Sequence, residues 1–272
     1  MRWLGDHAIR WMPGESNCPN TLCLIVTSDR LVAVDSSGLP LKILPNDPRI
    51  RDRRKNVVGT INDILYKFVC LETPSSDFEY ELLRPVLIRL NSEEFIPLNA
   101  AMQVMDFMQE HRYCGSCGDK THPSKSDRGL ICQGCGHASY PRISPCVIIL
   151  ITREREILLG RSPRFIEGMY STLAGFIEAG ESAEHACHRE IFEEVGVEIN
   201  APIYQGSQNW PFKHSLMLGY RAEWKKGDIS VDGIEIVDAQ WFSIDALPKL
   251  PPKASISRGM IDQFLSEQNR LN

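Results

Sequence analysis

The sequence predicts an α+β protein with three parts: a mainly β N-terminal domain (1–98), a helix followed by a cysteine-rich segment (99–142), and a C-terminal domain (143–272). Short β-rich runs fill roughly the first hundred residues, and two close cysteine pairs follow them. Beyond residue 143, strand-like and helix-like apolar patterns are mixed. At about 150 residues per domain, a chain of 272 residues has room for one to three domains.

The N-terminal domain is predicted to begin with a β-hairpin. Two β-rich runs, 21–26 and 31–35, are separated by a Ser-Asp-Arg turn. Further strands are predicted around 64–71 and 86–90, and the charged, proline-containing stretch 45–56 is predicted to be a loop.

Helical periodicity begins at the end of this domain. The apolar spacing in 99–112 predicts a helix, with Asn99 as its N-cap. In the C-terminal domain the patterns predict a hairpin from 143–152 and 157–160, a helix over 182–195, strands over 215–224 and 239–242, and a closing helix over 255–269.

Charge and hydropathy exclude several classes of protein. Thirty basic and 35 acidic residues give a net charge of −5, so the whole chain does not attract nucleic acid or anionic membranes. The longest apolar run, 146–151, is far shorter than the roughly 20 residues of a membrane-spanning helix. Residues 1–7 acquire charge before a signal-peptide apolar stretch develops. We therefore expect a cytoplasmic protein without a membrane partner.

Four of the nine cysteines form two pairs, Cys114-x2-Cys117 and Cys132-x2-Cys135. Glycines around each pair permit tight turns that direct two thiolates at one ion. Four thiolates leave no open coordination position, so we expect one structural Zn²⁺ per subunit. From His111 to Pro145 the chain holds five basic and two acidic residues, so nucleic-acid binding by this segment is an alternative.

A second group of candidate ligands lies in the predicted helix 182–195. Glu190, Glu193 and Glu194 share one helical face at about 100° per residue, and their mutual repulsion would be relieved by a divalent cation. Mg²⁺ or Mn²⁺ suits carboxylates combined with substrate phosphates. The alternative is a solvated acidic face. A preceding glycine-rich loop and Arg189, which can hold a neighbouring carboxylate, favour the cation site.

These residues lie within a known motif. Residues 175–197 match every fixed position of the Nudix box, G-x5-E-x7-R-E-U-x-E-E-x-G-U with U aliphatic, so the chain resembles hydrolases of nucleoside diphosphates linked to another moiety. Residues 207–215, SQNWPFKHS, resemble the SQPWPFPxS motif of the NAD(H) diphosphatases of NudC type, which also carry a four-cysteine zinc ribbon before the Nudix domain. Asn209 and Lys213 stand where this family usually has proline.

The resemblance implies a zinc ribbon followed by a Nudix α/β/α sandwich. It also implies metal-dependent hydrolysis of the diphosphate bond of NADH or NAD⁺ to nicotinamide mononucleotide and AMP, in a homodimer. The same chemistry would allow removal of 5′ NAD caps from RNA. Two alternatives remain open: hydrolysis of another derivative such as ADP-ribose, and a zinc-ribbon nucleic-acid binder whose Nudix domain only senses a nucleotide.

The resemblance also assigns site residues. The catalytic residues would be Glu190, Glu193 and Glu194, and these three, with Glu235 and the carbonyl of Ala174, would bind Mg²⁺ or Mn²⁺. The substrate-binding residues would be Tyr140, Phe176, Gln208, Asn209, Trp210, Pro211, Phe212, Lys213, His214, Ser215 and Ser257.

Overall fold

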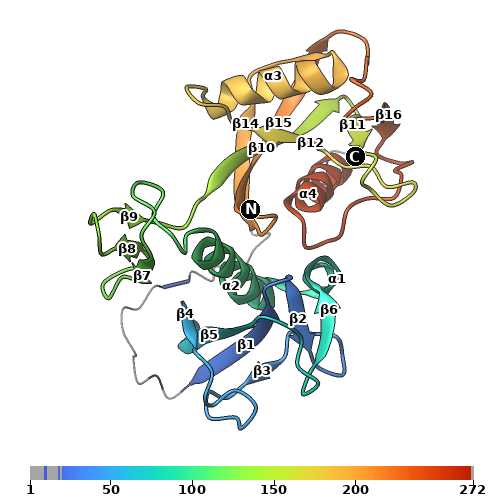
Figure 1. Ribbon diagram of the computed structural model, residues 1–272. Coiled ribbons are helices and arrows are strands. Elements are labelled where there is room, and N and C mark those ends of the chain that lie inside the picture. Colours follow the sequence, from blue (N-terminus) through green and yellow to red (C-terminus); the bar gives the residue numbers. More distant parts are fainter. Residues whose placement is uncertain (1–8, 11–17, 19, 271–272) are drawn as a thin grey trace. The chain divides into compact units, whose positions relative to one another are not determined.

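The computed structural model describes residues 9–10, 18 and 20–270 (Figure 1). The chain forms two compact units. The N-terminal unit extends to Arg142 and also includes Pro211–His214, whereas the C-terminal unit holds Ile143–Trp210 and the chain from Ser215 onward. Residues 1–7, from which the expected location was partly inferred, lie outside the described residues. In the described part, no helix is long and apolar enough to cross a membrane.

The N-terminal unit is built on a mixed sheet with the strand order β4-β5-β1-β2-β6, and β3 pairs with β1. The predicted hairpin is confirmed, because β1 and β2 pair antiparallel through Val26 and Val32. Cys23 and Ile25 on β1 pack with Val69 on β5 in the buried core. The strands are β1 (Thr21–Thr27), β2 (Leu31–Val34), β3 (Lys42–Ile43), β4 (Asn56–Ile61), β5 (Ile64–Leu71) and β6 (Glu79–Leu82).

The predicted strand over 86–90 is wrong, because helix α1 (Leu83–Arg89) occupies this segment. Leu83, Val86 and Leu87 are its buried residues. Their i, i+3, i+4 spacing places them on one helical face, whereas a strand would bury alternate residues. A short apolar run is ambiguous between the two states.

Helix α2 (Ser92–Glu110) begins a full two turns before the predicted start at Asn99. Asn91 is the N-cap, and its side chain accepts a hydrogen bond from the backbone N–H of Glu94. Asn99 lies inside the helix and is buried. Pro97 is accommodated within the helix, although an interior proline usually ends or kinks one.

The cysteine-rich segment forms a small antiparallel sheet of the order β7-β8-β9 within the N-terminal unit. The side chain of Arg128 donates a hydrogen bond to the carbonyl of Val58 on β4, which ties this sheet to the larger one. Its strands are β7 (Thr121–Pro123), β8 (Leu130–Cys132) and β9 (Ala138–Ser139).

The C-terminal unit contains a seven-stranded sheet of the order β13-β15-β10-β11-β16, in which β12 pairs with β10 and β14 with β15. The predicted hairpin of β10 and β11 is confirmed, as are the two predicted strands that correspond to β15 and β16. The strands are β10 (Ser144–Arg153), β11 (Glu156–Arg161), β12 (Leu173–Phe176), β13 (Glu198–Ile199), β14 (Ile203–Trp210), β15 (Ser215–Lys226) and β16 (Asp238–Ser243).

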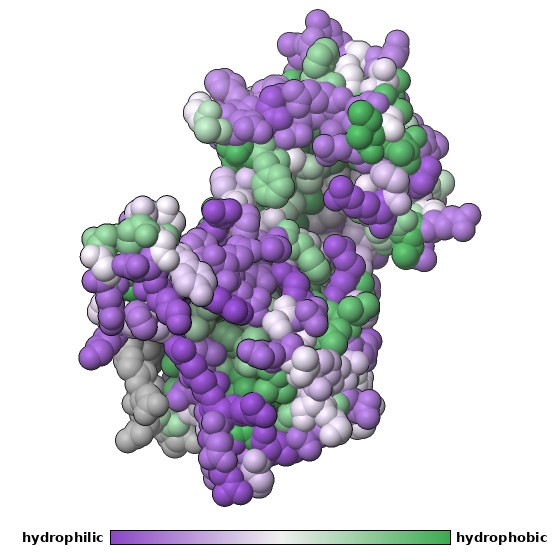
Figure 2. Space-filling view, in the orientation of Figure 1, coloured by the Kyte–Doolittle hydropathy of each residue, from purple (hydrophilic) through white to green (hydrophobic). Residues whose placement is uncertain are grey.

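Helices α3 (Ala183–Val195) and α4 (Ile256–Arg270) cover opposite faces of this sheet, as predicted for an α/β/α sandwich. Ile149 and Tyr220 are paired neighbours that pack in one core with α3. The next pair along the strands, Ile148 and Gly219, faces the other way. There α4 lies so close to Gly219 that an added Cβ would come within 2.9 Å of Ile256. The outer surface of α3 is hydrophilic (Figure 2).

Candidate metal centres and substrate loop

The four paired cysteines converge as predicted. Among the described residues, Cys114, Cys117, Cys132 and Cys135 are the group of possible metal ligands whose donor atoms all lie within 4.8 Å of one another. Cys114 Sγ lies 3.6 Å from Cys135 Sγ, and Cys117 Sγ lies 3.4 Å from Cys132 Sγ. Tetrahedral zinc with Zn–S bonds of about 2.3 Å separates its sulfurs by roughly 3.8 Å. The cluster therefore fits one Zn²⁺.

Backbone turns hold these sulfurs in place. Gly118 donates a hydrogen bond to the carbonyl of Cys114, and Gly136 donates one to the carbonyl of Cys132. Both glycines have left-handed φ values, 83° and 76°. Backbone N–H groups of Ser116 and Cys117 lower the pKa of the Cys114 thiol to about 6. The backbone thus favours the thiolate at Cys114, which is the form that binds metal. At Cys117 the backbone N–H of Asp119 acts in the same direction, but the neighbouring sulfurs outweigh it and raise the pKa to about 12.

The carboxylate site is assembled from α3 and strand β12. The side chain of Ser182 caps α3 by accepting a hydrogen bond from the N–H of His185, and Gly196 ends the helix at a φ of 72°. The carboxylate of Glu190 lies against Gly175, where an added Cβ would come within 1.8 to 2.1 Å of it. Glycine is therefore required at this position if the Glu190 carboxylate is to lie beside β12 and the adjacent Ala174.

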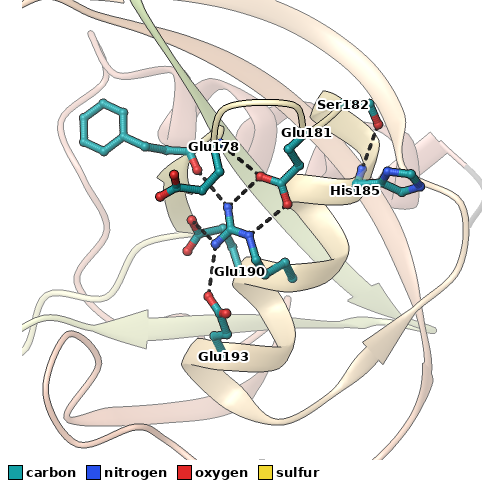
Figure 3. Close-up of polar contacts among 8 residues, drawn as sticks. Glu178, Glu181, Ser182, His185, Glu190 and Glu193 are labelled. Carbon is teal, nitrogen blue, oxygen red and sulfur yellow. Dashed lines mark hydrogen bonds and ion pairs between the residues drawn. The ribbon is translucent and has the colours of Figure 1, made fainter.

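Arg189 connects the helix to the loop before it. Glu181 of the loop and Glu190 and Glu193 of the helix are labelled in Figure 3. The guanidinium of Arg189 donates hydrogen bonds to Glu181 at 2.8 Å, to Glu190 at 2.8 Å and to Glu193 at 3.0 Å. It also donates to the backbone carbonyl of Phe176 at 2.9 Å. Arg189 accordingly fixes the Glu190 carboxylate, as the sequence suggested, and it reaches Glu181 through a bidentate pair.

Glu194 is the most deeply buried of these carboxylates, with 5% of its surface exposed. Burial raises its pKa to about 8, and the nearby charges of Glu190, Glu235 and Asp232 act in the same direction. Burial likewise raises the pKa of Glu190. The Oε2 atom of Glu194 is buried and has no hydrogen-bond partner. An anionic pocket that contains a partnerless carboxylate oxygen fits a divalent cation.

Glu235 reaches this cluster from a loop that the sequence patterns did not define. The side chain of Asp232 accepts hydrogen bonds from the backbone N–H groups of Ile234, Glu235 and Ile236. The N–H of Asp232 in turn donates to the carbonyl of Glu194 at 3.1 Å. Asp232 therefore ties the loop that carries Glu235 to the end of α3. An Asp whose side chain can bond backbone N–H groups ahead of it is the local signal for such a turn.

Glu193 and Phe176 are among the predicted site residues on this unit that are exposed rather than enclosed. The side chain of Glu193 is 58% exposed, and its ion pair with Arg189 places it at the rim of the cluster. Phe176 is 51% exposed, so its ring is free to stack against a flat ligand.

Gln208 and Ser257 are both buried, and their side chains make contacts within the C-terminal unit. The Gln208 amide donates to the carbonyl of Ala254 and accepts from the N–H of Ile256, both at 2.7 Å, which fixes the start of α4. Ser257 Oγ lies 2.9 Å from Ser171 Oγ and accepts a hydrogen bond from Thr172. These bonds anchor the segment just before β12.

The turn after β14 packs with the N-terminal unit. Arg30 donates a hydrogen bond to the carbonyl of Pro211, and the guanidinium of Arg84 stacks 4.3 Å from the ring centre of Phe212. Lys213 pairs with Glu110 at 2.7 Å, and the ring nitrogen Nδ1 of His214 is buried without a partner. Arg30 and Arg84 were not assigned from the sequence, because nothing in a local pattern links them to a turn more than 120 residues away.

The remaining predicted substrate-binding residues lie at the ends of their elements. Asn209 and Trp210 close strand β14, and Ser215 opens β15 opposite Trp210. Tyr140 follows the cysteine sheet, is 56% exposed, and its hydroxyl donates to Asp127 at 3.3 Å.

Comparison with known families supports the two motifs read from the sequence. Residues 142–264 match the NUDIX domain, and residues 109–140 match the NADH pyrophosphatase zinc ribbon domain. The first match includes the glutamate cluster and the second includes all four paired cysteines.

Individual relatives are similar to this chain over about two thirds of its length. A protein of Pseudomonas aeruginosa named NAD-capped RNA hydrolase NudC is 49% identical over 187 residues, which cover 69% of this chain and 67% of the relative. A protein of Stutzerimonas stutzeri with the same name is 48% identical over 68% of this chain and 67% of its own length. A NUDIX hydrolase structure from Nitrosomonas europaea matches 58% of this chain with a TM-score of 0.51 at 19% identity, and so shares the fold.

Proposed function

The chain belongs to the NudC-type Nudix hydrolases, which combine a NADH pyrophosphatase zinc ribbon with a NUDIX domain, and we propose that its glutamate cluster is the catalytic site. The reaction is metal-dependent hydrolysis of the diphosphate bond of NAD(H) to nicotinamide mononucleotide and AMP. The observation that carries the assignment is the buried Glu194. Its Oε2 atom has no hydrogen-bond partner, and the carboxylates of Glu190 and Glu235 lie near it.

The chemistry requires positive charge at the diphosphate. A diphosphate repels anionic nucleophiles, so hydrolysis needs cations that neutralise the phosphoryl oxygens and lower the pKa of the attacking water. We assign the binding of these cations, Mg²⁺ or Mn²⁺, to Glu190, Glu194, Glu235 and the carbonyl of Ala174. Gly175 leaves the space in which the Glu190 carboxylate lies, and Arg189 holds that carboxylate in position.

Glu193 has a different environment and a different proposed role. Its exposed carboxylate can take a proton from water or complete the cation site, and its bond to Arg189 keeps it at the rim. We assign it as general base or additional metal ligand.

We propose that flat and polar surfaces of the predicted substrate-binding residues hold the dinucleotide. Stacking on aromatic rings would orient the adenine or nicotinamide ring without taking part in bond breaking. Phe176 and Tyr140 are the exposed aromatic candidates. The other proposed substrate-binding residues are Gln208, Asn209, Trp210, Pro211, Phe212, Lys213, His214, Ser215 and Ser257, with Ser257 contributing through its backbone because its hydroxyl is already bonded.

RNA that carries a 5′ NAD cap presents the same diphosphate bond, and the relatives from Pseudomonas and Stutzerimonas are named for this substrate. We therefore propose that this chain also removes NAD caps. From the resemblance to NudC-type enzymes we also propose that it is a homodimer in the cytoplasm. Light scattering would measure the oligomeric state.

The test is a panel of substrates incubated with the purified protein. NADH, NAD⁺, ADP-ribose and NAD-capped RNA are each supplied with Mg²⁺ or Mn²⁺, and the products are separated by chromatography. We expect AMP and reduced nicotinamide mononucleotide from NADH, and no product after EDTA is added. Turnover of ADP-ribose alone would replace the NAD(H) assignment. No turnover of any of them, together with tight RNA binding, would identify a nucleotide-sensing RNA binder instead.

A further inference from the structure

The N-terminal unit contains a cavity that the proposed reaction does not use. Its volume is about 610 Å³, and it is lined by strand β5, the second half of α2 and the loop before β4. Phe68, Met105 and Met108 supply apolar surface. Arg53 and Arg54 approach from the loop, and Arg112 follows the end of α2.

A second cavity of about 390 Å³ continues the first. It shares Arg54, Met108 and Arg112 with the larger cavity and extends to Tyr113 and Lys120 beside the cysteine sheet. We call the two cavities together the basic trough. Tyr113 is 61% exposed, so an exposed aromatic ring borders the cationic side chains.

The four cations of the basic trough are Arg53, Arg54, Arg112 and Lys120, and their side chains make no hydrogen bond or ion pair with any residue that the structure describes. Some other arginines of this unit are paired, as Arg30 is with Asp106 and Arg89 with Glu81. Glu72 is the carboxylate that also lines the larger cavity. Four cations against one carboxylate leave a surface that attracts anions.

We propose that the basic trough binds the phosphodiester backbone of single-stranded RNA, with Tyr113 as a stacking platform for a base. Cations spread along two joined cavities match a chain of phosphates, whereas a single phosphate would need donors that converge on one point. Apolar surface and an exposed aromatic ring suit unpaired bases. The inference rests on the proposed action on capped RNA. It assigns the RNA chain that follows the 5′ NAD cap to a binding site separate from the glutamate cluster.

The test measures RNA binding without catalysis. A labelled, uncapped single strand of about twenty nucleotides is titrated with the full chain at several salt concentrations, and affinity is read by fluorescence anisotropy. We expect the double variant Arg54→Gln/Arg112→Gln to bind about tenfold more weakly near 0.1 M salt. The dependence of log affinity on log salt concentration should become shallower by about 1.4, because each phosphate contact to single-stranded nucleic acid contributes about 0.7.

A matched control removes the same charge outside the trough. Arg51 and Lys125 are exposed, lie in the same loop and the same cysteine-rich segment, and line neither cavity. We expect Arg51→Gln/Lys125→Gln to retain parental affinity within about twofold. Equal losses in both double variants, or parental binding by Arg54→Gln/Arg112→Gln, would overturn the proposal.

Two further readouts separate this site from the catalytic one. Tyr113→Ala should weaken RNA binding about tenfold while Tyr113→Phe retains it, since stacking needs the ring and not the hydroxyl.

Arg54→Gln/Arg112→Gln should hydrolyse NADH at the parental rate but show a raised KM for NAD-capped RNA. Displacement of the RNA by AMP at similar concentrations would overturn the proposal in favour of a mononucleotide site. If the parent hydrolyses no NADH at all, the binding titration still tests the trough.

Discussion

The cysteine cluster and the glutamate cluster bring their ligand atoms together to different extents. The four sulfurs lie within 4.8 Å of one another and can complete a tetrahedron without any other ligand. The glutamates come from α3 and from the loop that Asp232 holds, and they range from the buried Glu194 to the exposed Glu193. A closed ligand set suits a structural ion, whereas an open set leaves coordination positions for water and a diphosphate.

The pKa shifts of Cys114 and Glu194 have opposite directions and different causes. Backbone N–H groups lower the pKa of Cys114 to about 6, which favours its anionic form. Burial and neighbouring carboxylates raise the pKa of Glu194 to about 8, which disfavours its anionic form. Backbone N–H groups therefore favour the thiolate at Cys114, whereas neighbouring sulfurs raise the pKa of Cys117 to about 12. In the glutamate cluster, a bound cation would stabilise the negative charge of the carboxylates.

The largest expected effect on activity comes from a substitution in the glutamate cluster. Glu194→Gln keeps the shape of the side chain but removes the buried charge, so we expect kcat for NADH to fall by about three orders of magnitude or more. The fold should be retained, as measured by circular dichroism. Glu184→Gln on the exposed side of the same helix is the matched control and should keep parental activity. Substantial activity of a folded Glu194→Gln variant would remove the basis for the proposed catalytic site.

Disrupting the cysteine cluster should destabilise the fold and should not act on the catalytic step directly. Cys114→Ser removes one of four zinc ligands, and we expect loss of bound zinc together with unfolding or aggregation, because structural zinc contributes several kcal/mol of folding free energy. Zinc content and the thermal midpoint Tm are the measurements. Cys18→Ser, at a cysteine outside the cluster, should leave both unchanged. A stable but inactive Cys114→Ser variant would contradict a structural role.

One glycine in each cluster sharpens the contrast. At Gly175 a methyl group would overlap the Glu190 carboxylate, so Gly175→Ala should displace a ligand and lower Mn²⁺ affinity and kcat by about 10- to 100-fold. At Gly115 in the ribbon an added Cβ meets no atom within 4 Å, so Gly115→Ala should retain zinc and Tm. Titration with Mn²⁺ measures the first effect. Equal Mn²⁺ affinity of parent and Gly175→Ala would show that the Glu190 carboxylate can lie elsewhere.

The sequence predicted most successfully where periodicity and spacing are local. Helix α3 begins after the N-cap Ser182 and ends at Gly196, as its capping residues and apolar spacing indicate. The cysteine spacing likewise predicted the convergence of four sulfurs. The predictions failed where local signals are ambiguous or interrupted, at the apolar run that forms α1 and at the start of α2, which continues through Pro97.

Contacts distant in the chain could not be predicted in the same way. The turn Pro211–His214 packs with Arg30, Arg84 and Glu110, and no periodicity within either segment encodes that contact. The basic trough also depends on tertiary structure, because Arg54 and Arg112 are 58 positions apart in the chain and meet only at the cavity wall. Such groupings follow from the packing of α2 on the N-terminal sheet and not from a motif.

The smallest expected effect is on stability and concerns Glu181. This residue bonds Arg189, which in turn holds Glu190 of the glutamate cluster. Its bidentate bond to Arg189 lowers its pKa from 4.5 to about 2. A carboxylate with a depressed pKa in the folded state contributes stability above the pKa of the unfolded state, and this contribution is lost as the pH falls from about 4.5 toward 2. Glu181→Gln should therefore lower Tm at neutral pH, and the difference from the parent should shrink as the pH is lowered to about 3. Calorimetry across this range measures the gap, with Glu184→Gln as the control that lacks the arginine bond. A gap that stays constant with pH would mean that the pair with Arg189 contributes only through packing.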